Sequence, residues 1–223
     1  MKRPFWLLLF VFFLIPMAVF AQDPGDGWKP AKHGDGIQVY TRPAKDSDNN
    51  EFLGITDVEA PIKVILEVFK DIPSFPQWFG FCRDIKLYEN ISETHEIVYF
   101  ILATPWPVKD RDMLIDVAFD IREEEGETII SMNAVKDELI PIQDEYVRMT
   151  KLIGKATLTR IDENTTHVTY TVNSDPAGYI PAAISNMLSK NQPYDTLKGL
   201  KMMVKNDKYF ELAGIPKEGG AGQ

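Results

Sequence analysis

The residue types that most often carry chemistry are sparse and scattered in this chain. The three histidines, His33, His95 and His167, lie far apart, and none stands in the paired spacing typical of zinc sites. Cys82 is the only cysteine, so an intrachain disulfide is excluded, and we interpret it as a small, partly buried apolar side chain. The sequence also lacks a nucleophile elbow, a phosphate-binding glycine loop and a dinucleotide fingerprint. We therefore predict no catalytic residue, no metal site and no cofactor, and we expect a protein that is not an enzyme.

Two short segments hold the remaining polar and aromatic candidates. Asp110, Arg111 and Asp112 place three charges side by side before a predicted strand, and a surface charge cluster is one interpretation of them. Trp106 stands between two prolines, a stiff presentation that suits an amphipathic ring at a membrane interface. The alternative is that Trp106 is a loop residue packed on the domain.

Composition indicates one globular domain whose partner is bound inside rather than on the surface. The chain has 223 residues, of which 44% are apolar and 26% charged, as in ordinary soluble domains. Its net charge is −9, which disfavours nucleic acid because phosphate contacts need clustered Lys and Arg. No internal repeat or linker-like segment supports a division into two domains.

The amino end has the pattern of a secretory signal. Lys2 and Arg3 precede an apolar run from Phe5 to Ile15, and small residues at Val19 and Ala21 form a cleavage pattern. Removal of residues 1–21 would change the net charge to −11, because two bases and no acid are lost. An uncleaved anchor fits less well, since the run is shorter than the roughly 20 residues of a spanning helix. We expect an exported protein, periplasmic or extracellular, with a leader at 22–27.

The middle of the chain predicts an antiparallel meander. In 113–121 every odd position is apolar and Asp116 and Asp120 alternate with these positions, as in a sheet with one wet face. An opening hairpin is predicted at 37–42 and 52–58. The other predicted strands are 84–88, 96–102, 128–135, 146–160 and 167–173.

Two helices are predicted to cover the apolar face of this sheet. Residues 61–71 form one amphipathic helix that starts at Pro61. Apolar residues from Ile180 to Val204 keep a 3.6-residue rhythm and predict a long tail helix. Pro193 lies inside it and removes the amide that would bond the Ser189 carbonyl, so we expect a kink or break there, either to follow the curvature of the sheet or as a functional hinge.

Three segments in this order resemble the START (StAR-related lipid-transfer) domain family, in its exported, single-domain bacterial form. They are the strand Gly36-Ile37-Gln38-Val39-Tyr40-Thr41-Arg42, the segment Pro107-Val108-Lys109-Asp110-Arg111-Asp112, and the turn Asp175-Pro176-Ala177-Gly178-Tyr179-Ile180-Pro181. The match runs over 28–209, and Trp78 stands where the family often has a Trp. The resemblance implies an α+β helix-grip fold, in which a curved antiparallel sheet wraps around a long C-terminal helix, and leaves 210–223 as a flexible tail.

The resemblance also implies a function and a site. We expect a monomer that holds one lipid or other hydrophobic molecule in an internal tunnel, as a carrier or sensor, with transient membrane contact and with Trp106 in the region that gates the tunnel. Arg111 or an acidic neighbour would point into the tunnel towards a polar group of the lipid. The alternative is a cyclase or aromatase-like enzyme on the same architecture, which would need titratable groups converging in the cavity. The residues predicted to contact the ligand are Trp78, Tyr99, Ile101, Arg111, Val117, Phe119, Met132, Met149, Tyr170, Val172, Ile184, Met187 and Leu188.

Overall fold

One antiparallel sheet carries the fold. The computed structural model describes residues 24–25, 27–45, 49–135 and 140–217, so the predicted signal at 1–21 lies outside the described residues. Neighbouring strands follow the order β1-β2-β3-β10-β9-β7-β6-β5-β4, and the short β8 pairs in parallel with β6. The strands are β1 (Lys29–Gly34), β2 (Ile37–Pro43), β3 (Asn50–Val58), β4 (Cys82–Ser92), β5 (His95–Leu102), β6 (Arg111–Arg122), β7 (Glu127–Ala134), β8 (Val147–Arg148), β9 (Lys151–Arg160) and β10 (Thr166–Asp175).

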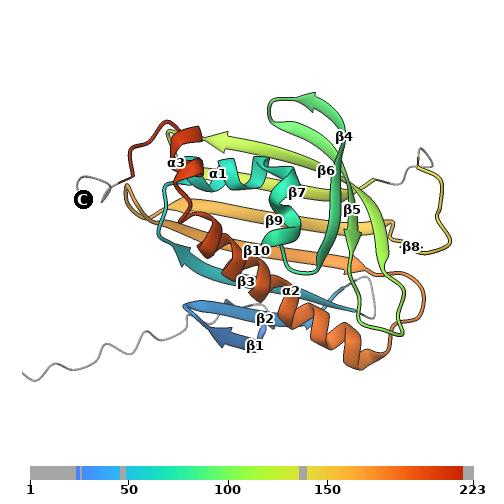
Figure 1. Cartoon of the computed structure of the whole chain (residues 1–223). Helices are drawn as coiled ribbons and strands as arrows, with labels where there is room; N and C mark the ends of the chain where they lie inside the picture. The colour runs from blue at the N-terminus through green and yellow to red at the C-terminus, as the bar shows by residue number, and fades with distance from the viewer. Residues whose placement is uncertain (1–23, 26, 46–48, 136–139, 218–223) are drawn as a thin grey trace, which may run out of the picture.

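The helices lie on one face of this sheet, and the strands curve around them (Figure 1). They are α1 (Ile62–Lys70), the 3-10 helix η1 (Ile72–Gln77), α2 (Ala182–Met203) and α3 (Asp207–Leu212). The long α2 contacts β1, β2 and β3, whereas α1 lies over β9 and beside α3. The predicted meander, opening hairpin and tail helix are confirmed, and the arrangement is the predicted α+β helix-grip fold.

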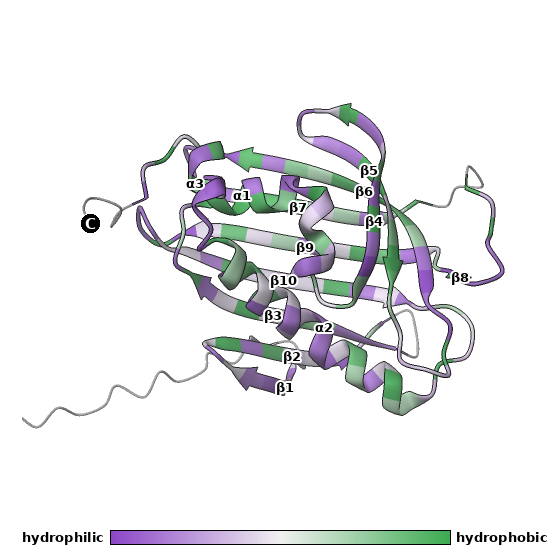
Figure 2. Cartoon of the chain, viewed as in Figure 1, coloured by the Kyte–Doolittle hydropathy of each residue, from purple (hydrophilic) through white to green (hydrophobic). Residues whose placement is uncertain are grey.

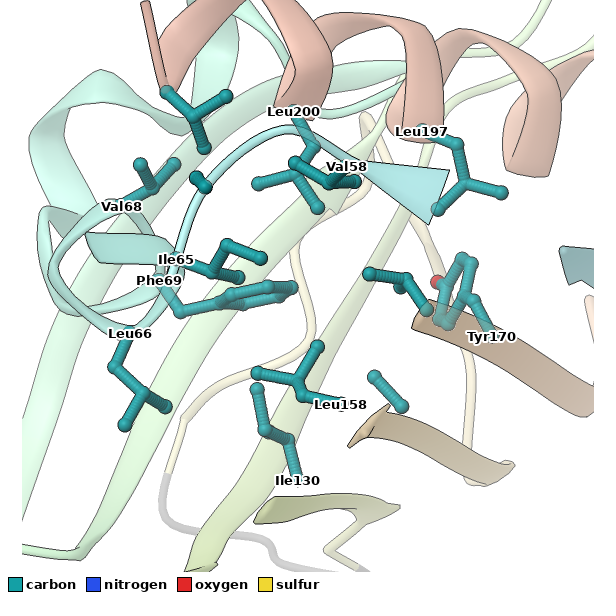
Figure 3. Packing of buried hydrophobic residues seen from close by; sticks show 14 of the residues in the cluster. Val58, Ile65, Leu66, Val68, Phe69, Ile130, Leu158, Tyr170, Leu197 and Leu200 are labelled. Atoms are coloured by element: carbon teal, nitrogen blue, oxygen red, sulfur yellow. The ribbon is translucent and has the colours of Figure 1, made fainter. Parts of the chain in front are cut away.

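The core forms where the helices meet the concave face. Val58, Ile65, Leu158 and Leu200 are fully or almost fully buried, and Figure 3 shows them converging from β3, α1, β9 and α2. At roughly 1.5–3 kcal/mol for each large apolar side chain, this layer supplies much of the driving force that holds the helices on the sheet.

The C-terminal half of α2 packs very closely on β3 and on the loop after η1, with a glycine at each contact. A Cβ atom on Gly199 would lie 2.1 Å from the Trp78 carbonyl oxygen, and one on Gly54 would lie 2.7 Å from Leu197. Pro193 is buried, with its Cβ 3.4 Å from the position of a Cβ on Gly54. The predicted break at Pro193 is wrong, because α2 continues through it as one helix.

Three boundaries differ from the sequence prediction. No strand was predicted at Lys29–Gly34, but β1 forms there, pairs with β2 and is largely hydrophilic (Figure 2). The strand predicted at 146–160 divides into β8 and β9. The prediction of a flexible tail from residue 210 is wrong for 210–215, because α3 extends to Leu212 and both Phe210 and Ile215 pack on the core.

The two outer strands of the sheet are irregular. β4 departs from its register with β5 at three places along its 11 residues, and each time the extra residue belongs to β4. β1 has one such bulge, next to Pro30. The pairs between the inner strands, in the sheet order β3-β10-β9-β7-β6-β5, keep a continuous register.

Candidate functional site

A cavity of about 140 Å³ lies between the concave face of the sheet, η1 and the N-terminal half of α2. Its wall is mainly apolar, and several wall residues come from one row across the sheet. In this row Val117 of β6 pairs with Met132 of β7, Met132 with Gly154 of β9, and Gly154 with Val172 of β10. A Cβ on Gly154 would lie 3.2 Å from Met132 and 3.4 Å from Val172, so the side chains of these two residues pack over the glycine and form the floor of the row.

Part of the predicted site is found in this wall. The alternation in β6 identified the correct face of that strand, and the same face continues through β7 and β10. The predicted residues that line the cavity are Val117, Phe119, Met132, Met149, Tyr170, Val172 and Leu188.

On β5 the prediction chose the wrong face. Val98, Phe100 and Leu102 line the cavity, whereas Tyr99 and Ile101 do not. The Tyr99 hydroxyl instead donates a hydrogen bond to the Asp112 carboxylate over 2.8 Å. Both faces of β5 are apolar in sequence, so period-two alternation gives no signal for the inward face.

On α2 the predicted stripe is displaced around the helix. The residues that line the cavity are Ser185, Leu188, Ser189 and Gln192, at the spacing of one helix face. Ile184 and Met187, which were predicted to line it, do not. The prediction followed the most apolar residues, but two serines and a glutamine occupy the inward face.

Trp78 supports the cavity from behind rather than lining it. Its ring is buried and lies 5.5 Å from Phe69, 4.9 Å from Phe75 and 5.5 Å from Phe79, measured between ring centroids. The three phenylalanines line the cavity and Trp78 does not. The prediction of ligand contact is corrected here, because the phenylalanines lie between the indole and the cavity. Phe75 and Phe79 line the cavity but were not among the residues predicted to contact the ligand.

Arg111 holds two loops together and does not reach the cavity. The side chain is on the cavity face of β6 and only 1% exposed, but it is covered by the turn that joins β10 to α2. Its guanidinium donates to the carbonyl oxygens of Pro176 at 3.1 Å and Ala177 at 3.2 Å, and also to that of Lys109. Burial lowers its pKa. The predicted contact of Arg111 with a ligand is therefore corrected, because its donors are taken by backbone carbonyls.

The acidic neighbours of Arg111 are also committed to protein partners. The Asp112 carboxylate, 1% exposed, accepts hydrogen bonds from Arg148 Nε at 3.0 Å and Nη2 at 2.8 Å. Asp110 pairs with Arg83 at 2.6 Å and accepts from the Thr104 amide at 2.8 Å. The surface-cluster interpretation of these charges is also wrong, because all three side chains are buried.

Trp106 projects into solvent from one of the two loops that Arg111 holds together. It is 91% exposed, so the interpretation that it packs on the domain is wrong. Tyr179, just after the turn held by Arg111, is 86% exposed. Since Arg111 joins the backbones of Lys109 and Ala177, these two aromatic residues belong to loops that are held to each other.

Few polar groups enter the cavity wall. Gln192 donates to Tyr170 at 3.4 Å and to Thr196 at 3.2 Å, while its side-chain oxygen is buried without a partner among the described residues. Burial raises the pKa of Tyr170. Glu96, at the start of β5, also lines the cavity, and burial raises its pKa.

Cys82 lies in a small apolar cluster at the β4 side of the cavity, and burial raises its pKa to about 12. Within the ranges that the structure describes, no group of three or more His, Cys, Asp and Glu side chains comes together as metal ligands would. None of the described helices has both the length and the hydropathy needed to cross a bilayer.

Comparisons with known proteins match this geometry. The family model of the START domain matches residues 24–209. An uncharacterized protein of Pseudomonas aeruginosa is 31% identical over 176 residues, which are 79% of this chain and 86% of that protein. The crystal structure of a STAR-related lipid transfer protein fragment from Xanthomonas axonopodis is 29% identical with a TM-score of 0.73, over 81% of this chain and all of that one. Human StAR-related lipid transfer protein 5 shares the fold, with 18% identity and a TM-score of 0.72 over 80% of this chain and 86% of that one.

Proposed function

Because this chain belongs to the START domain family, whose members bind hydrophobic ligands, we propose that it holds a single lipid or other hydrophobic molecule beneath α2 as a carrier or sensor. The observation that carries the proposal is the cavity itself. A concave sheet roofed by a helix would normally be filled by side chains at close to crystal density, yet here about 140 Å³ stays open. One water molecule needs only about 10–15 Å³.

The size of the cavity suggests that α2 moves when a ligand enters. Ligand pockets usually measure about 300–1,000 Å³, more than this cavity offers. Every buried residue of α2 lies at Gln192 or beyond, so the half that roofs the cavity is the less firmly held half. We infer that this N-terminal half yields to admit a full lipid, while the C-terminal half stays fixed on the loop after η1.

The residues that line the cavity favour a non-catalytic function over an enzymatic one. Acid–base chemistry needs two or more titratable groups close to the reacting atoms. Among the described residues that line the cavity, only Glu96 and Tyr170 titrate, and the hydroxyl of Tyr170 bonds to Gln192 rather than to a base.

Mass spectrometry of lipids that copurify with the protein from its native compartment tests the proposal. We expect about one hydrophobic molecule per chain in the wild type and much less in Val117→Phe, whose ring would occupy the cavity. Ile153→Phe is the matched control, because Ile153 is 67% exposed. Equal lipid content in both variants, or none in the folded wild type, would contradict the carrier.

We also propose export and membrane contact. Export is supported by the basic and apolar pattern of 1–21, and the amino-terminal sequence of the protein from a periplasmic fraction would begin at Gln22 if the signal is cleaved there. Membrane contact is supported by the exposure of Trp106 and Tyr179, whose rings suit the headgroup region. In a vesicle assay, Trp106→Ala should extract lipid more slowly than the wild type; extraction at the parent rate would contradict the role.

A further inference from the structure

One carboxylate of the cavity wall has no partner among the residues that the structure describes. Glu96 lies on the same face of β5 as Val98 and Phe100, and all three line the cavity. No hydrogen bond or ion pair joins its side chain to any described residue, whereas Asp110 and Asp112, towards the other end of the β5–β6 pair, both pair with arginines. The side chain is partly buried, and removal from water is the only cause that raises its pKa.

The surroundings of Glu96 offer no positive charge. Among the described residues of the wall there is no Lys, Arg or His. Its cross-strand partner on β6 is Val117, and the next residue along that row is Met132. A carboxylate placed against apolar side chains loses hydration, and this loss is offset only by a hydrogen-bond donor or a cation.

The same wall opposes an anionic guest. A fatty-acid carboxylate or a phosphate in the cavity would meet Glu96 with no cation to neutralise either charge, and like charges at close range repel. A neutral alcohol would donate one hydrogen bond to the carboxylate, and a cationic amine would donate a hydrogen bond and also form an ion pair with it.

We propose, on the basis of the proposed carrier function, that Glu96 is a ligand-binding residue that selects an amphiphile with a cationic amine and discriminates against anionic lipids. The amine nitrogen donates to the Glu96 carboxylate and the hydrocarbon part lies along Val117, Met132 and Val172. The proposal thus adds a headgroup class to a cavity that otherwise specifies only an apolar chain.

Displacement of the neutral dye Nile red by decylamine, decanol and decanoic acid, which have equal chains and different headgroups, tests the proposal. In Glu96→Gln we expect at least about a tenfold weaker affinity for decylamine, the scale of one hydrogen bond to a charged group, with less than about a threefold change for decanol. Decanoic acid should bind Glu96→Gln better than the wild type. Glu93→Gln is the matched control, because it removes the same charge from an exposed position three residues away.

The outcomes separate this proposal from the carrier function. If decanol binds every protein and Glu96→Gln keeps the wild-type affinity for decylamine, the role of Glu96 is overturned and the carrier stands. If Glu93→Gln weakens decylamine binding as much as Glu96→Gln does, the effect is one of overall charge and the proposal is again overturned. If none of the three compounds displaces the dye from the wild type, both proposals fail.

Discussion

Replacement of Gly199 by alanine tests how closely α2 is seated on the loop that carries Trp78. The added Cβ would lie 2.1 Å from the Trp78 carbonyl oxygen and 2.8 Å from its carbonyl carbon, whereas ordinary contacts begin near 3.4 Å. The helix and the loop would therefore have to separate by about 1.3 Å. No rotamer change can provide this separation, because the atoms in conflict belong to the backbone and to a Cβ.

The expected magnitude is the balance of two effects. Alanine favours the helix by about 1 kcal/mol over glycine, because glycine has more backbone freedom to lose. Overpacking costs about 1–3 kcal/mol and occasionally more, and a conflict between backbone atoms belongs at the upper end of that range or above it. We expect a net destabilisation of about 2 kcal/mol, equivalent to a fall in Tm of about 4–8 °C for a domain of this size.

Urea and thermal unfolding measure this effect directly. Lys190→Ala is the control, since Lys190 is exposed on the same helix and should change the free energy of unfolding by less than about 0.5 kcal/mol. A Gly199→Ala protein at least as stable as the wild type would refute the close seating of α2, because the helical preference of alanine would then act unopposed.

Three further predictions concern the hydrogen bonds of Arg111, the N-terminal half of α2 and the thiol of Cys82. Arg111→Met should destabilise the protein by about 3 kcal/mol, because it removes three hydrogen bonds from a buried charged donor to loop carbonyl oxygens; an unchanged urea midpoint would contradict this. Amides of 184–191 should exchange with deuterium faster than those of 195–203, because the buried residues of α2 begin at Gln192, and equal protection would count against it. Cys82, whose pKa is raised to about 12 by burial, should react with thiol reagents at mildly alkaline pH only after unfolding; rapid reaction of the folded protein would refute its burial.

The sequence predicts the architecture well where one face of an element differs from the other. β6 alternates apolar and acidic residues, so both the strand and its inward face could be identified. The apolar rhythm of the tail likewise located α2 to within a few residues of its ends. β1 gave no such signal, because Lys29–Gly34 contains a proline, a glycine and two lysines and becomes a strand only through its backbone pairing with β2.

The candidate site was harder to predict because it is defined by which apolar residues remain unpacked. β5 is apolar on both faces, so the choice of Tyr99 over Val98 had no physical basis in the sequence. Arg111 was placed on the correct side of β6, but only the three-dimensional path of the Pro176–Ala177 turn shows that its donors are used there. Glu96 was missed for the same reason as Val98, although its position two residues before Val98 would have identified it once the face of β5 was known.

The bulges in the outer strands β1 and β4 affect whether this open sheet can associate edge to edge with other copies of the protein. An unpaired strand edge is a template for addition of another chain, and β4 is long enough to serve as one. A strand docking on it would lose registry at each of the three bulged positions, and one docking on β1 would meet Pro30, which has no amide to donate. The irregular margins therefore disfavour fibril-like stacking at both edges of the sheet, while the helices and the ligand cavity keep the concave face between those edges.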